Sequence, residues 1–403
     1  MTPVSPALAI DGGPPVRTKT LPYGRQSIDE SDIAAVVETL RSDWLTTGPK
    51  VEEFERAFAA FTGARHAVAV CNGTAALHAI TAGFQIAPGD EVIVPAITFV
   101  ASANCVVYQG GTPVFADVDA DTLLIDPASV AARITPRTRA IIAVDYAGQP
   151  CDYAALRALA GQHGLTLIAD ACHALGGSLE GRPVGTLADV SAFSMHPVKP
   201  ITTGEGGMIT TDDDALARRV RIIRNHGITT EFRQREEQGS WAYEMQELGY
   251  NYRLSDIHCA LGVTQLRQLP GWVVRRQEIA ARFDEAFADL PEASPLARLP
   301  HREHAWHLYV LRLNLDRLRV SRAKVFAALR AEGINVNVHY APVHLHPFYR
   351  NRFGFQPGLA PVAEAAYERL LTLPLFPRMT DDDIEDVITA VNKVLGAFSQ
   401  VRS

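Results

Sequence analysis

The sequence is poor in cysteine and has no long hydrophobic run. Its 403 residues include five cysteines, an odd number, and no two form a C-x-x-C pair. Neither a disulfide framework nor a zinc ribbon is expected, and the thiols read as small buried hydrophobes in a reducing cytoplasm. No stretch approaches ~18 uninterrupted apolar residues, and no basic start precedes an apolar run at the N-terminus. We therefore expect a cytoplasmic protein with no membrane-spanning segment and no signal peptide.

Excess positive charge is also missing. Lys and Arg number 38 against 45 Asp and Glu, a formal net charge of −7. Phosphate contacts need clustered Lys and Arg, so a nucleic-acid partner is not expected. An anionic ligand would have to be held by local basic groups or backbone N–H donors. Apolar residues at 47% and charged residues at 21% are ordinary values and exclude disordered, collagen-like and coiled-coil classes.

Short apolar runs alternate with helical stretches through the first two thirds of the chain. The runs cover residues 66–70, 91–94, 113–118, 139–144, 165–168, 190–194 and 207–211. This alternation predicts an α/β fold, a mostly parallel mixed sheet with helices on both faces. We predict an N-terminal arm over residues 1–26, a large domain over 27–265 and a smaller C-terminal α+β domain over 266–403.

Helical periodicity marks both ends of the chain. After Asp29, the residues Ile33, Val36, Val37 and Leu40 share one helix face. The smaller domain is expected to contain strands over 307–313 and 334–339 around a helix at 324–333. In the last helix Thr380 is the expected N-cap and residues 381–383 are acidic, where the helix dipole favours negative charge. Its buried stripe is predicted to be Ile384, Val387, Ile388, Val391 and Leu395.

Two residues suggest a chemistry. Asp170 ends an apolar strand, at the edge of an open α/β sheet where ligands bind. Lys199 lies 199 − 170 = 29 residues later, between Pro197 and Pro200 and before a glycine-rich turn. An aspartate alone is more often a helix cap, and a lysine alone a solvated charge. Together they match pyridoxal 5′-phosphate (PLP), whose pyridine nitrogen needs a carboxylate and whose aldehyde needs a desolvated lysine.

Other residues could bind the phosphate of the cofactor and pack against its ring. Gly73 and Thr74 follow a strand and open a helix, where backbone N–H groups bind phosphate. Ser194 stands five residues before Lys199 and could add a hydroxyl. Phe99 could cover the cofactor ring, although ordinary core packing explains it equally well.

These motifs resemble the DegT/DnrJ/EryC1/StrS sugar aminotransferases, which are fold-type I PLP enzymes. The resemblance runs from about Tyr23 to the last helix. It is carried by Gly48-x-x-Val51-x-x-Phe54-Glu55 and by residues 72–77, 170–174, 193–199 and 203–207. Residues 23–28, 144–148, 196–203 and 338–343 are similar to a narrower group, the transaminases of pseudaminic acid biosynthesis. Those enzymes aminate C4 of a UDP-linked 4-keto-6-deoxy-N-acetylhexosamine.

The resemblance implies roles for matching residues. Lys199 would bind the cofactor aldehyde and move the proton, Asp170 would hold the pyridine nitrogen, and His173 would lie near the phenolic oxygen. The phosphate would be bound by Gly73, Thr74, Ser194 and, from the partner subunit of a homodimer with shared active sites, Asn251. The sugar-nucleotide site would be lined by Tyr23, Trp44, Leu45, Thr46, Asn337, Val338, His339 and Tyr340. The amino donor would be L-glutamate.

Other interpretations remain open at this stage. The sugar could be another nucleotide-linked 4-keto-6-deoxy sugar, of the perosamine, bacillosamine or legionaminic acid type. A PLP-dependent sugar dehydratase of the same fold would carry histidine in place of Lys199. A non-catalytic PLP-binding regulator would carry a DNA-binding domain, and no basic helix-turn-helix segment is visible. His339, His344 and His346 have no matching Cys or carboxylate pattern, so no metal site is expected.

Overall fold

The computed structural model describes residues 7–230 and 239–400. Within these ranges seven strands form one central sheet, in the order β1-β9-β8-β5-β4-β2-β3. The strands are β1 (His66–Val70), β2 (Glu91–Pro95), β3 (Thr112–Ala116), β4 (Thr138–Val144), β5 (Thr166–Asp170), β8 (Val190–Ser194) and β9 (Gly207–Thr211). All neighbours pair in parallel except those of β9, which runs antiparallel to β1 and β8. The predicted α/β class with a mostly parallel mixed sheet is confirmed.

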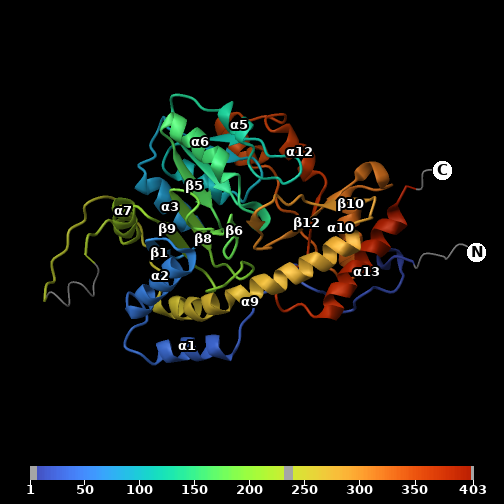
Figure 1. The fold of residues 1–403 in the computed structure, drawn as a ribbon, viewed down its shortest axis with the longest axis horizontal. Coiled ribbons are helices and arrows are strands. Elements are labelled where there is room, and N and C mark those ends of the chain that lie inside the picture. The colour runs from blue at the N-terminus through green and yellow to red at the C-terminus, as the bar shows by residue number, and fades with distance from the viewer. Residues whose placement is uncertain (1–6, 231–238, 401–403) are drawn as a thin grey trace, which may run out of the picture.

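Helices cover both faces of this sheet (Figure 1). The helices of this part of the chain are α1 (Glu30–Leu40), α2 (Pro49–Thr62), α3 (Gly73–Gly83), α4 (Ala101–Tyr108), α5 (Pro127–Ala131), α6 (Tyr153–His163), α7 (Asp214–Arg224) and the long α9 (Asp256–Phe287). Sheet residues are almost wholly buried; β2 and β9 have no exposed position. That burial follows from helices on both faces and explains why these strands read as continuous apolar runs.

The C-terminal part is smaller and mixed. Its sheet has the order β10-β12-β13, formed by β10 (Ala293–Pro295), β12 (Tyr309–Leu313) and β13 (Leu370–Leu373). A minor sheet joins β11 (Arg302–Glu303) to β6 (Ser178–Leu179) and β7 (Arg182–Pro183). The helices are α10 (Arg322–Ala331), α11 (Pro347–Phe353), α12 (Pro361–Tyr367) and α13 (Asp381–Phe398), and the short 3-10 turns are Ala9–Asp11, Tyr146–Gly148, Leu315–Arg317 and Val343–Leu345.

Two hydrophobic clusters underlie these parts. The larger surrounds the seven-stranded sheet and includes Val343 and Leu370 from the C-terminal part. The second joins the later turns of α9 to α10, α13 and the C-terminal sheet, and takes in Leu8 and Leu21 of the N-terminal arm. Helix α9 runs through the predicted domain boundary at 265/266, which stays a prediction. Of the predicted arm, residues 1–6 lie outside the described residues.

The helix predicted after Asp29 is present as α1. The face that carries Ile33 and Leu40 is not covered, since these side chains are 48% and 54% exposed, while Asp32 and Thr39 face inward. Asp32 accepts hydrogen bonds from Thr264 and Gln265 of α9, so polar contacts hold this helix in place. The prediction of a strand over 334–339 was wrong, because this segment makes only isolated bridges, Ile334 with Leu21 and Asn337 with Thr372.

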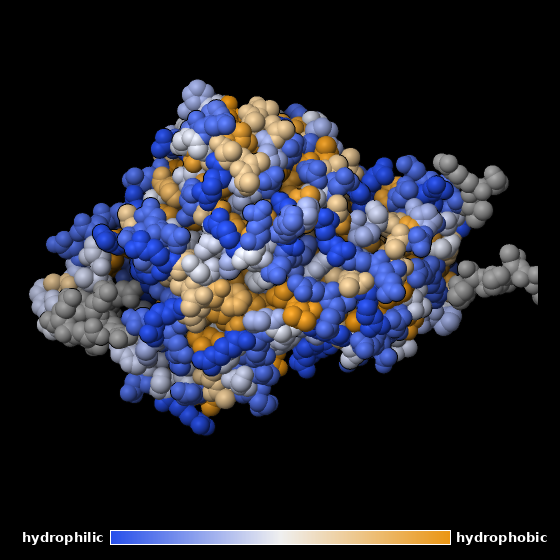
Figure 2. Space-filling view, viewed as in Figure 1, coloured by the Kyte–Doolittle hydropathy of each residue, from blue (hydrophilic) through white to orange (hydrophobic). Residues whose placement is uncertain are grey.

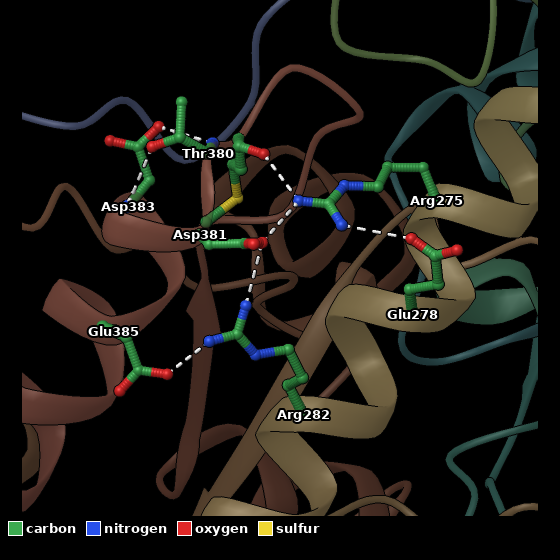
Figure 3. A network of polar contacts seen from close by, with 8 residues as sticks. Arg275, Glu278, Arg282, Thr380, Asp381, Asp383 and Glu385 are labelled. Carbon is green, nitrogen blue, oxygen red and sulfur yellow. Dashed lines mark hydrogen bonds and ion pairs between the residues drawn. The ribbon is translucent and has the colours of Figure 1, made fainter.

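The start of α13 matches its prediction. Thr380 Oγ1 accepts from the Asp383 backbone N–H at 3.1 Å, and the Asp383 carboxylate accepts from the Thr380 N–H at 3.0 Å. This reciprocal pair is a capping box. Arg275 and Arg282 of α9 both bond to Asp381 beside it (Figure 3). Asp381 is 75% exposed in its side chain, so these ion pairs add little stability and the cap matters more.

We expect Thr380→Ala to lower the free energy of unfolding by about 1 kcal/mol, because it leaves the first turn of α13 without its side-chain acceptor. Thr380→Ser keeps the hydroxyl and should stay close to the wild type. Urea denaturation of the three proteins measures the difference. Equal stability of the alanine and serine variants would contradict the importance of the cap.

Candidate active site

A cavity of about 590 Å³ opens where β5 and β8 end and α3 begins. It gathers most of the residues selected from the sequence: Tyr23, Gly73, Thr74, Phe99, Asp170, His173, Ser194, Lys199, Asn337, Val338, His339 and Tyr340. They come from segments far apart in the chain. A cavity at the carboxyl edge of an open α/β sheet is the expected position for a ligand.

Lys199 lies on the loop between β8 and β9, and its side chain reaches the cavity. The loop is tightened by a hydrogen bond from the Lys199 N–H to the His196 carbonyl at 2.8 Å. Burial lowers the pKa of the Lys199 amine, and the nearby Asp170 carboxylate acts in the opposite direction. The lowered pKa makes a neutral, nucleophilic amine easier to form.

Asp170 occupies the last position of β5 and is 6% exposed. Its Oδ2 accepts a hydrogen bond from Ser102 Oγ at 2.6 Å, and its Oδ1 accepts a longer one from the Cys172 N–H at 3.3 Å. Ser102 is fully buried on α4 and also contacts Thr98 Oγ1 at 2.7 Å. These hydrogen bonds therefore orient the Asp170 carboxylate, and because Asp170 lines the cavity, the carboxylate can still contact a ligand there.

Two histidines lie beside the lysine. The ring centroids of His173 and His307 are 4.4 Å apart, and His307 Nε2 is 3.5 Å from Lys199 Nζ. His173 Nε2 is 3.1 Å from the Tyr340 hydroxyl. Burial lowers the pKa of both histidines well below the usual range, and the Lys199 charge adds to the effect. Both imidazoles are therefore neutral at pH 7 and can accept or donate a hydrogen bond.

The N-terminus of α3 provides a concave backbone surface. Asn72 caps the helix, accepting from the Ala75 N–H at 2.8 Å. A Cβ atom placed on Gly73 would meet Ser194 Cβ at 2.8 Å, so only glycine lets these two segments approach so closely. The arrangement places the first-turn N–H groups and the Ser194 and Thr74 hydroxyls around one end of the cavity. That donor set suits a phosphate.

The opposite wall is built from the N-terminal arm and the segment after α10. Tyr23 hydrogen-bonds Asn337 and its ring centroid lies 5.5 Å from that of His339. His339 is held by Thr372, whose hydroxyl lies 2.9 Å from Nδ1, and by the Tyr146 hydroxyl, which donates to the His339 carbonyl. This wall therefore presents aromatic and polar side chains to the cavity, and hydrogen bonds to residues outside the cavity lining hold them in position.

Four of the selected residues do not line this cavity. Asn251 is exposed and lies in the segment before α9, in an isolated bridge with Asn225. Trp44, Leu45 and Thr46 lie near a second cleft of about 470 Å³, which the adjacent Thr47 lines together with Arg218, Arg221, Arg224 and Arg253. In a single chain these residues are thus separate from Lys199, and their roles stay predictions.

Residues 26–392 match the DegT/DnrJ/EryC1/StrS aminotransferase family. The chain belongs to this family. Spore coat polysaccharide biosynthesis protein SpsC of Bacillus subtilis is 44% identical over 382 residues, 94% of this chain and 98% of that one. Among solved structures, Helicobacter pylori PseC, an aminotransferase of pseudaminic acid biosynthesis, is 32% identical with a TM-score of 0.89, covering 94% of this chain and 100% of that one.

A PLP-form structure is also similar. It is a Streptococcus pneumoniae protein described as a sugar aminotransferase, 34% identical with a TM-score of 0.87 over 94% of this chain and 99% of that one. The family is PLP-dependent, and the residues present here fit the cofactor. The cradle at Gly73 has no space for a Cβ atom, and His173 Nδ1 is buried with no hydrogen-bond partner among the described residues. The chain is a sugar aminotransferase of this family.

Sequence reasoning missed Ser102 and His307. Ser102 contacts Asp170 across 68 positions and His307 contacts Lys199 across 108. Neither residue lies in a glycine-rich or proline-flanked motif of the kind that identified the other site residues in the sequence. In the described part of the chain no group of three or more His, Cys, Asp or Glu side chains is arranged to hold a metal ion. Within the same ranges no helix is both long and apolar enough to cross a membrane.

Proposed function

We propose that this enzyme transfers an amino group from L-glutamate to C4 of a UDP-linked 4-keto-6-deoxy-N-acetylhexosamine, as in pseudaminic acid-type biosynthesis in the cytoplasm. The observation that carries the proposal is the convergence of Lys199, Asp170 and His173 beside the Gly73 cradle in one cavity. The similarity to PseC supports the choice of sugar class. SpsC favours the alternative, another nucleotide-linked 4-keto-6-deoxy sugar, because it acts in spore coat polysaccharide biosynthesis.

The lysine has two tasks in this proposal. When bound, PLP supplies an electron-accepting ring that stabilises negative charge at the amine-bearing carbon. Lys199 would hold the aldehyde end in the resting enzyme. Once the amino group of the donor has displaced it, the freed, neutral Nζ would take the proton from the donor carbon and pass it back on the cofactor side. In the second half-reaction the same nitrogen would move the proton in reverse, toward C4 of the sugar. Burial lowers the pKa of Lys199, which favours the neutral amine that this role needs.

The surrounding residues set charge and position. Asp170 would hold the pyridine nitrogen and keep it protonated, and the hydrogen bond from Ser102 orients the carboxylate for this role. His173 lies where it can bond the phenolic oxygen, oriented by Tyr340. Gly73, Thr74 and Ser194 would hold the phosphate, and Phe99 would cover the ring. Tyr23, Asn337, Val338, His339 and Tyr340 line the wall that would face the keto sugar.

A substrate panel tests this function. The enzyme with PLP and L-glutamate is incubated with UDP-, GDP- and dTDP-linked 4-keto-6-deoxy sugars, and amino sugar and 2-oxoglutarate are measured together. We expect turnover with the UDP-linked N-acetylhexosamine and at least tenfold lower kcat/KM for the others. Preference for a GDP- or dTDP-linked sugar would select the alternative, and no release of 2-oxoglutarate with any of them would contradict transamination.

The position of Asn251 supports a homodimer with shared active sites. Asn251 is exposed, and the neighbouring segment carries the apolar side chains of Trp241 and Leu248, 89% and 77% exposed. This segment projects from the body of the molecule beside α7 (Figure 1). The face in Figure 2 is mostly hydrophilic, with apolar residues reaching the surface in several places, and Ile33 and Leu40 of α1 are also exposed. A second copy would cover these side chains and receive Asn251 at its phosphate.

Complementation tests the shared site. Lys199→Ala and Asn251→Ala are each purified, mixed and allowed to exchange subunits. If Asn251 acts in the partner's site, a mixed dimer has one site with both lesions and one with none, so about half of its sites should work. Activity that stays at the level of the unmixed variants, with mixed dimers verified, would contradict the shared site.

A further inference from the structure

His78 lies outside the cavity, yet it holds the segment that carries Asn251. It stands on α3, five positions after Gly73, and is 5% exposed. Its Nδ1 is 2.8 Å from the Tyr252 hydroxyl and its Nε2 is 2.6 Å from the Gln109 amide nitrogen. Because that amide nitrogen donates, Nε2 accepts and the Nδ1–H donates to Tyr252. Burial also lowers the pKa of His78, in agreement with a neutral ring.

Aromatic rings complete the contact. The Tyr250 and Tyr252 rings stack at 5.0 Å with an interplanar angle of 10°, and Tyr250 lies 4.8 Å from the His78 ring. The segment is also tied by its backbone, from the Cys71 N–H to the Tyr252 carbonyl at 2.8 Å. In an extended segment alternate side chains point to opposite sides. With both tyrosines on the His78 side, Asn251 faces away, where it is exposed.

We propose that His78 is a positioning residue for the active site of a second copy of this chain. By holding Tyr252 and the stacked Tyr250, it fixes the direction in which Asn251 reaches the partner's phosphate. The proposal rests on the shared site proposed above. Packing alone does not account for the choice of residue, because a phenylalanine would fill the same space and leave the Tyr252 hydroxyl and the Gln109 amide without their partner.

Three variants isolate this role. His78→Phe removes both hydrogen bonds, and Tyr252→Phe removes one and keeps the stack. Tyr108→Phe is the matched control, since Tyr108 touches the same imidazole, 5.1 Å between ring centroids, and is 54% exposed. His78→Asn is the conservative rescue, because its amide nitrogen falls near the former Nδ1.

The readout is cofactor binding rather than turnover. Apoenzyme is titrated with PLP, reduced with borohydride, and the fraction of Lys199 carrying the pyridoxyl group is measured by mass. We expect about a tenfold higher PLP concentration at half-saturation for His78→Phe and Tyr252→Phe, the loss typical of a buried hydrogen bond. Tyr108→Phe should shift less than twofold, and His78→Asn should recover part of the loss. No shift in His78→Phe would overturn the proposal.

Defined mixed dimers decide which site His78 serves. A wild-type chain paired with a Lys199→Ala/His78→Phe chain has one Lys199, and its site uses the Asn251 of the altered chain. Half-saturation of labelling at this Lys199 should need about tenfold more PLP. His78→Phe paired with a Lys199→Ala chain has its one Lys199 facing an intact Asn251 segment, and should label as the wild type does. The reverse result, in which His78 acts on its own chain's cradle through α3, overturns the proposal.

Asn251→Ala in the same two pairings separates this inference from the shared site. If Asn251 acts across the dimer and His78 does not, His78 is not its positioning residue and the shared site stands. If Asn251 itself acts within its own chain, the shared site fails and this inference fails with it.

Discussion

Replacing Lys199 by alanine should abolish turnover while leaving the fold intact. We expect kcat to fall by about 10³-fold or more, because the variant loses both the nitrogen that holds the aldehyde and the base that moves the proton. Steady-state release of 2-oxoglutarate measures the loss. Unchanged circular dichroism and thermal unfolding would show that the loss is chemical.

Lys199→Arg is the matched variant for charge. Arginine keeps the positive charge at this position, but it stays protonated and cannot act as a neutral amine. It should be as inactive as the alanine variant. Substantial activity in the arginine variant would mean that Lys199 contributes only charge and would contradict its assigned role.

Asp170→Asn should leave the protein folded and lower kcat by about 10²–10³-fold, the scale of losing one preorganised charge at a reacting group. An amide cannot keep the pyridine nitrogen protonated, so the ring no longer accepts electrons. Asp152→Asn is the matched control: Asp152 caps α6 by accepting from the Ala155 N–H, and asparagine caps equally well. Equal loss in the two variants would show that Asp170 has no special role.

Much of this fold could be predicted from the sequence, because short sequence patterns were strong and indicated the same elements. The runs at 190–194 and 207–211 became β8 and β9 with the same limits, since buried strands bounded by turn residues leave few alternatives. Thr380 formed the expected cap because its partner Asp383 lies only three positions away. Asp170 and Lys199 were recognisable because each lies in a distinctive local motif.

Other features depend on contacts that no local pattern encodes. Periodicity placed Ile33 and Leu40 on one face of α1 but could not tell what, if anything, in the same chain covers that face. Alternation over 334–339 suggested a strand, yet the neighbouring chain pairs with it only at isolated bridges. Ser102 joins the site through a single contact to Asp170 from another helix. Such residues become visible only once the sheet has brought their elements together.

The same limit applies to the outer part of the site. Tyr23 and His339 were named from resemblance and lie together in the cavity wall. Asn251 and Trp44 were named on the same basis and lie elsewhere in a single chain. The difference is physical: the first pair meets within one subunit, whereas the second would need a neighbouring subunit to reach a Lys199 cavity.

Borohydride reduction of the enzyme with bound PLP, followed by peptide mass mapping, tests the central claim most directly. The account predicts a pyridoxyl group on Lys199, and its loss from the cofactor-bound enzyme after incubation with L-glutamate, because the donor converts the cofactor to a form that no longer holds the lysine. A pyridoxyl group on any other lysine, or a label on Lys199 that glutamate leaves unchanged, would contradict it.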